Sequence, residues 1–157
     1  NNQLKYTKYE QGWLSWQTET VIPGAVGTGY RTSIDVDSNG YPHISHIHEN
    51  GILMHAYYDG TDWVQESVDS GLTIYGGTSL ELDVQDNPHI AYIDTNNNLR
   101  YAYYDGTDWN VNVYVTNAFN SVEFPSLALA QNDKPHITFS AYDVGNADER
   151  LFHAWMP

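Results

Sequence analysis

The 157-residue sequence has no cysteine, few basic residues and no long apolar run. The lack of cysteine excludes a disulfide framework and a metal site ligated by thiolates. Only six lysines and arginines stand against 20 aspartates and glutamates, which gives a formal net charge of -14. Such a charge repels polyanions and anionic membrane surfaces, so nucleic acid is not an expected partner. No apolar stretch approaches the length of a membrane span.

Helix signals are also missing, because no segment places apolar residues at amphipathic helical spacing. Tyrosine, valine, threonine, isoleucine and tryptophan instead fill short runs that are broken by Asp-Gly, Asn-Gly or Asn-Pro. This pattern is typical of β-strands joined by tight turns. The sequence therefore predicts a single all-β domain with essentially no helix.

What the sequence does contain is an internal repeat with a period of 46 residues. The heptapeptide Tyr-Tyr-Asp-Gly-Thr-Asp-Trp at 57–63 recurs unchanged at 103–109. The tripeptide Pro-His-Ile keeps the same step at 42–44 and 88–90, and it returns 47 residues later at 135–137. Three copies of one unit are therefore visible. The histidine of each Pro-His-Ile is expected to fill the same structural hydrogen-bonding position in every copy.

Each repeat contains four short runs, A to D, with the alternation of a β-strand. In the second copy these runs lie near 78–83, 88–94, 99–104 and 109–115. Four strands in a period of this length match one blade of a β-propeller, which is a twisted antiparallel sheet. The predicted fold is a β-propeller of four-stranded antiparallel blades, with thirteen strands and about three blades per chain.

The runs divide the chain into four parts. Residues 1–21 supply strands C and D of a shared blade, residues 22–68 and 69–115 form two blades, and residues 116–157 form an incomplete blade A-B-C. Propeller rings use about four to eight blades, so three blades do not close one. Either two copies form a six-bladed ring as a homodimer, which we favour, or the chain is a piece of a longer protein. Two C-type runs, Leu4–Tyr9 and Leu151–Met156, then compete for one place in the shared blade.

Residues 58–63 and 104–109 place Asp, Gly and Trp at the junction of strands C and D. This turn resembles the Asp-box of sialidase-like (BNR-repeat) propellers, although the leading serine of that box is missing. In the family the box is structural, and the resemblance implies only that role here. An aspartate and a glycine would form a tight turn, and the tryptophan would close over the blade edge. The residues concerned are Asp59, Gly60 and Trp63 in one copy and Asp105, Gly106 and Trp109 in the next.

The resemblance raises the question of sialidase catalysis, which uses three arginines that converge on a substrate carboxylate. The chain has three arginines, Arg31, Arg100 and Arg150, but they fall at non-equivalent positions of the repeat. We therefore expect solvated or paired surface arginines and no enzyme activity. A glycosidase is the weaker alternative, because Asp35 and Glu81 occupy equivalent strand A positions near the axis of a ring.

Two sequence patterns suggest metal binding. His46 and His48 share one face of a predicted strand, and Asp35, Asp37 and Asn39 match the opening of a calcium loop. The calcium pattern lacks the distant bidentate glutamate, and it erodes in the other copies. We favour a turn rich in asparagine and aspartate between strands A and B, and an aromatic-type packing slot at His46. No metal or cofactor is therefore expected, with calcium as the remaining alternative.

Strand C places large rings on one face and small residues on the other. The small face is expected to pack closely against a neighbouring blade. The aromatic face either fills the core between blades, which we favour, or forms inter-blade clefts that stack sugar rings. The candidate ligand contacts on that face are Tyr57, Tyr101, Tyr103 and Trp155.

These patterns predict a non-enzymatic binding module that recognises carbohydrate or a glycoconjugate through its inter-blade clefts. A structural or protein-interaction subunit of an extracellular assembly is the alternative. The high acidity and the initial Asn1 favour export, so we expect the protein to be secreted or at the cell surface.

Overall fold

The computed structural model describes residues 3–10, 12, 15–23, 29–71, 73–115, 119, 121–143, 145 and 148–155. Within these residues the only helices or strands are thirteen β-strands, and these strands form four antiparallel sheets. The predicted all-β fold built from propeller-type blades is thus confirmed. The described residues contain no helix that is long and apolar enough to cross a membrane.

The strands form four consecutive units, each a simple meander. The N-terminal hairpin contains β1 (Lys5–Glu10) and β2 (Ser15–Thr20). The first blade contains β3 (Tyr30–Val36), β4 (Pro42–Ile47), β5 (Leu53–Tyr58) and β6 (Trp63–Asp69). The second blade contains β7 (Ile74–Leu82), β8 (Pro88–Asp94), β9 (Leu99–Tyr104) and β10 (Trp109–Val115). The last sheet contains β11 (Val122–Leu129), β12 (Pro135–Asp143) and β13 (Asp148–Trp155).

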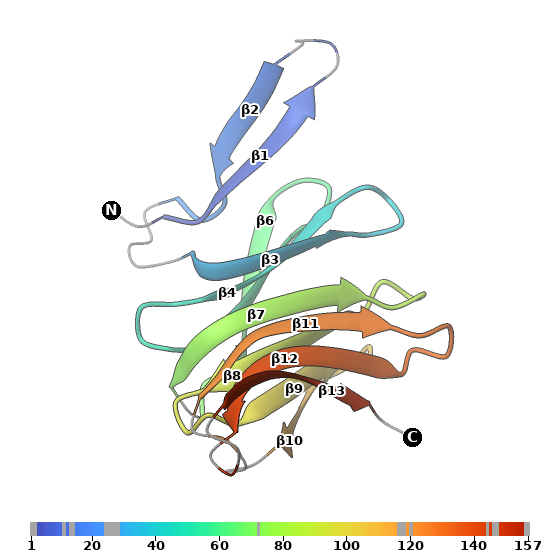
Figure 1. Cartoon of the computed structure of the whole chain (residues 1–157). Helices are drawn as coiled ribbons and strands as arrows, with labels where there is room; N and C mark the ends of the chain where they lie inside the picture. The colour runs from blue at the N-terminus through green and yellow to red at the C-terminus, as the bar shows by residue number, and fades with distance from the viewer. Residues whose placement is uncertain are drawn as a thin grey trace.

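The four units stack in chain order, from the hairpin at one end to the last sheet at the other (Figure 1). Strands β3, β7 and β11 lie side by side and form the inner edge of the stack (Figure 1). Side chains satisfy backbone N–H groups along this edge: Ser33 Oγ accepts from Leu80 at 3.0 Å, and Ser79 Oγ accepts from Leu127 at 2.9 Å. The same serine therefore links successive blades, one repeat apart.

The turns between strands A and B also repeat. In the first, Asp37 Oδ1 accepts the backbone N–H groups of Asn39 at 2.9 Å and Tyr41 at 2.7 Å. In the second, Asp83 Oδ1 accepts the corresponding N–H groups of Gln85 and Asn87. These aspartates therefore cap a turn. Each turn closes with one residue at positive φ, which is Gly40 (85°), Asp86 (64°) or Asp133 (58°).

The turns that carry the Asp-box-like sequence are capped by their aspartates. Asp59 Oδ1 accepts the N–H groups of Thr61 and Asp62, both at 2.8 Å. These backbone hydrogen bonds hold the pKa of Asp59 below its usual range. Gly60 has a φ of 97°, a left-handed conformation that favours glycine. Asp105 caps the second copy of the turn in the same way.

Each junction between units has its own apolar core. Ala56 and Ala102 are fully buried there, so the small face of strand C does pack closely against the neighbouring unit. Leu53 and Leu99 are also fully buried, and each contributes roughly 2–3 kcal/mol through burial. At the junction between the hairpin and the first blade, the buried residues are Leu4, Val21, Ile44 and Ala56.

Arg100 does not lie at the surface as the sequence suggested. Its guanidinium pairs with Asp69 of the first blade and, through Nε at 3.3 Å, with Asp94. Only 14% of its side chain is exposed. The Tyr92 hydroxyl donates to Asp69 Oδ2 at 2.7 Å and completes the cluster. The arginine is paired, as expected, but its partners come from two blades, and this burial could not be read from its place in the repeat.

Candidate ligand-binding clefts between the blades

Two clefts open at successive junctions of the stack. Cleft I lies between the hairpin and the first blade and has a volume of about 230 Å³. It is lined by Tyr6, Lys8, Glu19, Gly40, Tyr41, Pro42 and Tyr58. Cleft II lies between the first and second blades and has a volume of about 170 Å³. It is lined by His43, His55, Tyr57, Glu66, Asp86, Asn87, Pro88 and Tyr104.

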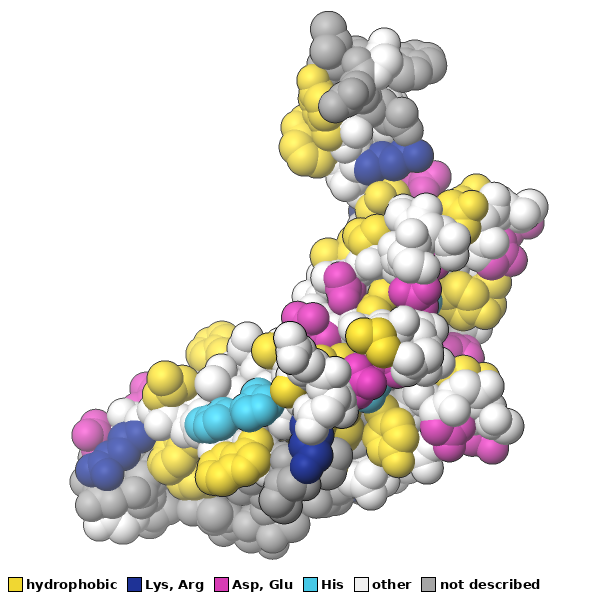
Figure 2. All heavy atoms as spheres, turned by 90° about the vertical axis from the view of Figure 1, so that its right-hand side faces the viewer, with side chains coloured by type: hydrophobic (Ala, Val, Ile, Leu, Met, Phe, Trp, Pro, Cys, Tyr) yellow, Lys and Arg dark blue, Asp and Glu magenta, His cyan; other side chains and the backbone are white. Residues whose placement is uncertain are grey.

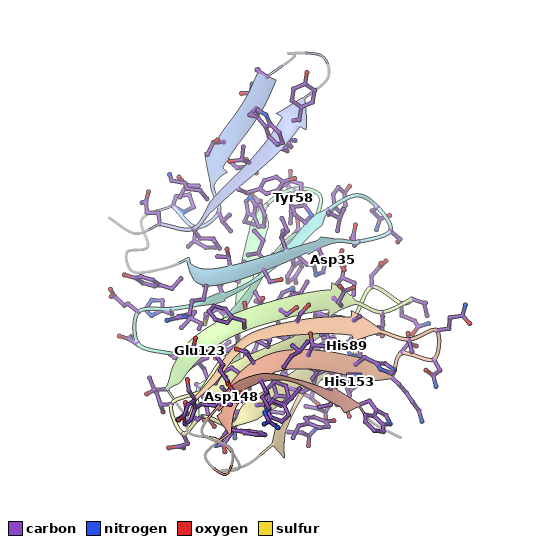
Figure 3. All side chains as sticks on the ribbon, viewed as in Figure 1. Asp35, Tyr58, His89, Glu123, Asp148 and His153 are labelled. Atoms are coloured by element: carbon purple, nitrogen blue, oxygen red, sulfur yellow. The ribbon has the colours of Figure 1, made fainter. Side chains whose placement is uncertain are left out.

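The two clefts are related by one step of the repeat. Pro42 and Tyr58 of cleft I become Pro88 and Tyr104 of cleft II. Tyr58 lies where the first blade meets the hairpin (Figure 3). The opposite wall of each cleft comes from strands C and D of the preceding unit, joined in cleft II by His43 of strand B, so each site combines residues of two units.

A glutamate faces a ring across strands C and D in both clefts. The strand register pairs Tyr6 with Glu19 in the hairpin and His55 with Glu66 in the first blade. Each glutamate follows a tryptophan of its own strand D by three residues, Trp16 in the hairpin and Trp63 in the first blade. The two acids therefore occupy one repeated position.

The tryptophan of the following unit contacts the lining residues of each cleft. Trp63 Nε1 donates to Glu19 Oε1 at 3.1 Å, and its ring meets Tyr6 edge-on at a centroid distance of 5.5 Å. In cleft II, Trp109 meets His55 edge-on at 5.6 Å. The tryptophan of the C-to-D hairpin therefore reaches across to the unit before it.

A chain of hydrogen bonds orients Glu66. His55 Nδ1 donates to Glu66 Oε1 at 2.9 Å, and His55 Nε2 accepts from His43 Nδ1 at 3.0 Å. The bond from His55, with a smaller effect from Trp109, lowers the pKa of Glu66. Burial, together with His55, lowers the pKa of His43 to about 4. At neutral pH the cleft therefore presents an ionised carboxylate supported by an uncharged His43.

The Pro-His-Ile histidines fill one structural position, as the repeat predicted. His43 Nδ1 bonds His55, His89 Nδ1 bonds the Tyr101 hydroxyl, and His136 Nδ1 bonds His153 at 3.1 Å. Each partner sits at the same place on strand C. The bond therefore joins strands B and C in all three copies.

The four candidate ligand contacts have different surroundings. Tyr57 lines cleft II, where it stacks on His43 and His55 at 5.5 and 5.3 Å. Tyr101 is only 1% exposed and belongs to the core, so its ring is closed to a ligand. Tyr103 is half-buried and stacks on a histidine of its own blade. Trp155 is 61% exposed on the last sheet. Of these candidates, Tyr57 lines a cleft described above.

The candidate metal ligands have other partners. His46 is fully buried and bonds the Gln65 amide at 3.0 Å, while His48 bonds the backbone of Asn50. Asp35 Oδ2 accepts the N–H of Leu82, and Asp37 caps a turn together with the exposed Asn39. Among the residues that the structure describes, no three His, Asp or Glu side chains are grouped to hold a metal ion. Calcium binding by Asp35, Asp37 and Asn39 is the alternative named above, and no observation tests it.

Sequence reasoning missed both glutamates. Each follows a tryptophan by three residues, and the two lie 47 residues apart, within one residue of the 46-residue period. That regular spacing was the available signal. In the second blade the same position holds Asn112, which hides the pattern from a search for identical residues.

No protein-family model and no curated protein matches the sequence. The solved structures that share its fold include a fucose lectin from Kordia zhangzhouensis in complex with methyl-fucoside. It superposes with a TM-score of 0.54 at 18% identity, over 80% of this chain and 95% of that chain. An exo-1,5-α-L-arabinanase from a bovine ruminal metagenomic library gives a TM-score of 0.55 at 10% identity. That match covers 91% of this chain and 59% of the arabinanase.

Both structures have β-propeller-type folds, and at these identities the likeness shows the fold alone. The chain is thus a β-propeller-type protein that spans little more than half the length of the arabinanase. The likeness to the Asp-box family remains a resemblance of the turn and the repeat.

Proposed function

We propose that this protein binds carbohydrate, without chemical turnover, in cleft II between its first and second blades. The observation that carries the proposal is the ionised Glu66 beside the rings of His55 and Tyr57 in cleft II, where Trp109 packs against His55. The cleft is smaller than cavities that hold drug-sized ligands, so it suits a single sugar ring. The fucose lectin that shares the fold supports the same class of ligand.

The chemistry of the cleft matches the two kinds of surface on a sugar. Sugar hydroxyl groups donate hydrogen bonds, and a carboxylate is a strong acceptor for them. The apolar C–H face of the ring can pack on an aromatic side chain such as Tyr57. The bond from His55 holds the carboxylate in place before a ligand arrives, which reduces the ordering cost of binding.

Binding is favoured over hydrolysis because cleft II lacks a second available carboxylate. Glycoside hydrolysis requires two carboxyl groups that flank the scissile bond. Asp86 also lines the cleft, but its two oxygens accept from the Ser38 N–H at 2.9 Å and the Ser38 hydroxyl at 2.6 Å.

The arabinanase that shares the fold keeps a glycosidase as the alternative. Asp35 and Glu81 lie on adjacent inner strands, and burial together with Asp35 raises the pKa of Glu81. Release of sugar from nitrophenyl arabinofuranoside or fucoside, lost in Glu81→Gln, would support that alternative. We expect no release.

A glycan array followed by calorimetry tests carbohydrate binding. The matched variants are Glu66→Gln and, as a control, Glu149→Gln on the last sheet. We expect wild type and the control to bind the same glycans. Glu66→Gln should bind about tenfold more weakly, because a charged acceptor becomes neutral. Wild type that binds no glycan, with or without calcium, or an unchanged Glu66→Gln, would contradict the proposal.

We also propose that a second copy of the chain covers the two ends of the stack. Leu151 is 77% exposed on the last sheet, whereas Leu53 and Leu99, at the same repeat position, are fully buried under the next unit. Toward the other end, the hairpin has only two strands, and Ile34 on β3 of the first blade is 52% exposed, whereas its counterpart Leu80 is 3% exposed. The two ends thus carry the two halves of one blade-to-blade contact.

Histidine and hydrophobic side chains lie together on the lower part of the stack (Figure 2).

Sedimentation velocity tests whether two copies of the chain associate through the ends of the stack. Wild type should sediment as a dimer and Leu151→Asp as a monomer. Val84→Asp is the control, because Val84 is 74% exposed on a turn and should not affect association. A monomeric wild type would refute self-association.

A further inference from the structure

The geometry points to cleft I as a second sugar-binding site, so that one chain binds two neutral monosaccharide units. This inference rests on the proposed function of cleft II. It goes beyond that function because cleft I has different rings from cleft II, although the proline, one tyrosine and the glutamate correspond. The strand register and the tryptophan contacts show that the differing residues serve the same construction.

The polar centre of cleft I repeats that of cleft II. Glu19 occupies the register position of Glu66, opposite a ring on the adjacent strand. Trp63 covers Glu19 from the following blade, and the hydrogen bond between them at 3.1 Å fixes the carboxylate. In cleft II the hydrogen bond from His55 fixes the carboxylate of Glu66. Both clefts therefore present one oriented carboxylate beneath an indole.

The aromatic surface of cleft I comes from the other wall. Lys8 stands where cleft II has Tyr57, which removes a ring from the strand C side. Tyr41 stands where cleft II has Asn87, which adds a ring on the side of the first blade. Tyr41 and Tyr58 meet edge-on at 5.6 Å and offer a surface for the C–H face of a sugar. The two substitutions compensate, so each cleft combines an acceptor with aromatic rings.

Among the described residues, the junction between the second blade and the last sheet lacks the carboxylate and the open wall of clefts I and II. Asn112 takes the place of Glu66, so no carboxylate stands at the repeated position. Tyr101 takes the place of His55, and its buried ring packs edge-on against Tyr114 at 5.4 Å. The buried ring of Tyr101 therefore stands where His55 lines the wall of cleft II. The structure therefore assigns two sites to the described part of the chain.

The side-chain N–H signals of the tryptophans provide a local readout for each cleft. In an ¹⁵N-labelled sample, the Trp63 indole reports on cleft I and the Trp109 indole on cleft II. Trp63 bonds Glu19 of cleft I and Trp109 packs on His55 of cleft II. Trp16 is 69% exposed and its ring contacts Tyr9, which lines neither cleft, so its signal is the control. The probes are the methyl glycosides of fucose, galactose, glucose and arabinose, titrated singly up to tens of millimolar.

We expect at least one glycoside to shift the signals of Trp63 and Trp109 and to leave Trp16 unchanged. Glu19→Gln should weaken the binding reported by Trp63 about tenfold and leave that reported by Trp109 unchanged, and Glu66→Gln should do the reverse. Glu19 is exposed, so its replacement should not disturb folding.

Two failures are distinguishable. A shift of Trp109 without a shift of Trp63 overturns the second site and leaves cleft II in place. A wild type in which neither signal moves with any of the four glycosides, while the array also shows no binding, overturns the proposed function itself.

Discussion

The buried His46 should make the folded protein sensitive to mild acid. Its ring is fully buried, and its Nδ1 has no hydrogen-bond partner among the described residues. Burial, reinforced by the nearby His48 and His55, lowers the pKa of His46 to about 4. An unfolded histidine takes up its proton near pH 6.5. Between these values the unfolded chain binds the proton and the folded chain does not.

The sign and size of the effect follow from this difference. The contribution of the neutral His46 to stability is complete above pH 6.5 and is lost as the pH falls toward 4. With these two pKa values, His46 alone removes about 2.5 kcal/mol of the free energy of unfolding between pH 7.5 and pH 4.5. His43 and His89, whose pKa values are also lowered by burial, add to the acid sensitivity. A variant that removes the imidazole of His46 separates its contribution to acid sensitivity from those of His43 and His89.

His46→Phe is that variant, because Phe139 fills the same slot in the third copy and is 2% exposed there. At pH 7.5 the variant should lie within about 1.5 kcal/mol of wild type. Between pH 7.5 and pH 4.5 it should lose about 2.5 kcal/mol less than wild type. Urea unfolding followed by tryptophan fluorescence at several pH values measures both quantities. Parallel pH profiles for the two proteins would refute the reasoning.

Two further predictions concern stability. Arg100→Met leaves Asp69 buried without its cation, so urea unfolding should show a loss of about 3–5 kcal/mol, and a loss below about 1 kcal/mol would show that the pair contributes little. Gly76→Ala would bring a Cβ atom within 2.2 Å of Ile93, whereas Gly77→Ala would make only an ordinary contact at 3.5 Å. Thermal unfolding should therefore show a loss above about 2 kcal/mol for the first variant and within about 1 kcal/mol for the second, and equal losses would contradict the packing.

The blades could be predicted because each part of the pattern occurs several times. Three of the four strands in the second blade have the predicted limits, since Asp-Gly and Asn-Pro mark their ends. Strand β7 begins at Ile74, four residues earlier than predicted. Its register against β8 shifts between Ile74 and Thr78, and this irregular segment contains Gly76 and Gly77. The two glycines have no strand-like pattern, so their inclusion could not be anticipated.

Inter-blade clefts could be anticipated from the repeat, but most of their lining residues could not, because each cleft joins side chains of two units. The repeat shows which residues correspond, but it does not show how one blade sits against the next. Tyr57 and Tyr101 both lie on the aromatic face of strand C, yet only Tyr57 lines a cleft, while Tyr101 is buried in the core. Glu19 and Glu66 became candidates only when Trp63 and Trp109 were found to reach back across the junctions.

A crystal structure of the protein soaked with a methyl glycoside that it binds would locate the sugar. We expect an intact glycoside in cleft II, with a ring hydroxyl on Glu66 and the ring beside Tyr57. A glycoside found only on the exposed Trp155, or a cleaved sugar beside Asp35 and Glu81, would contradict it.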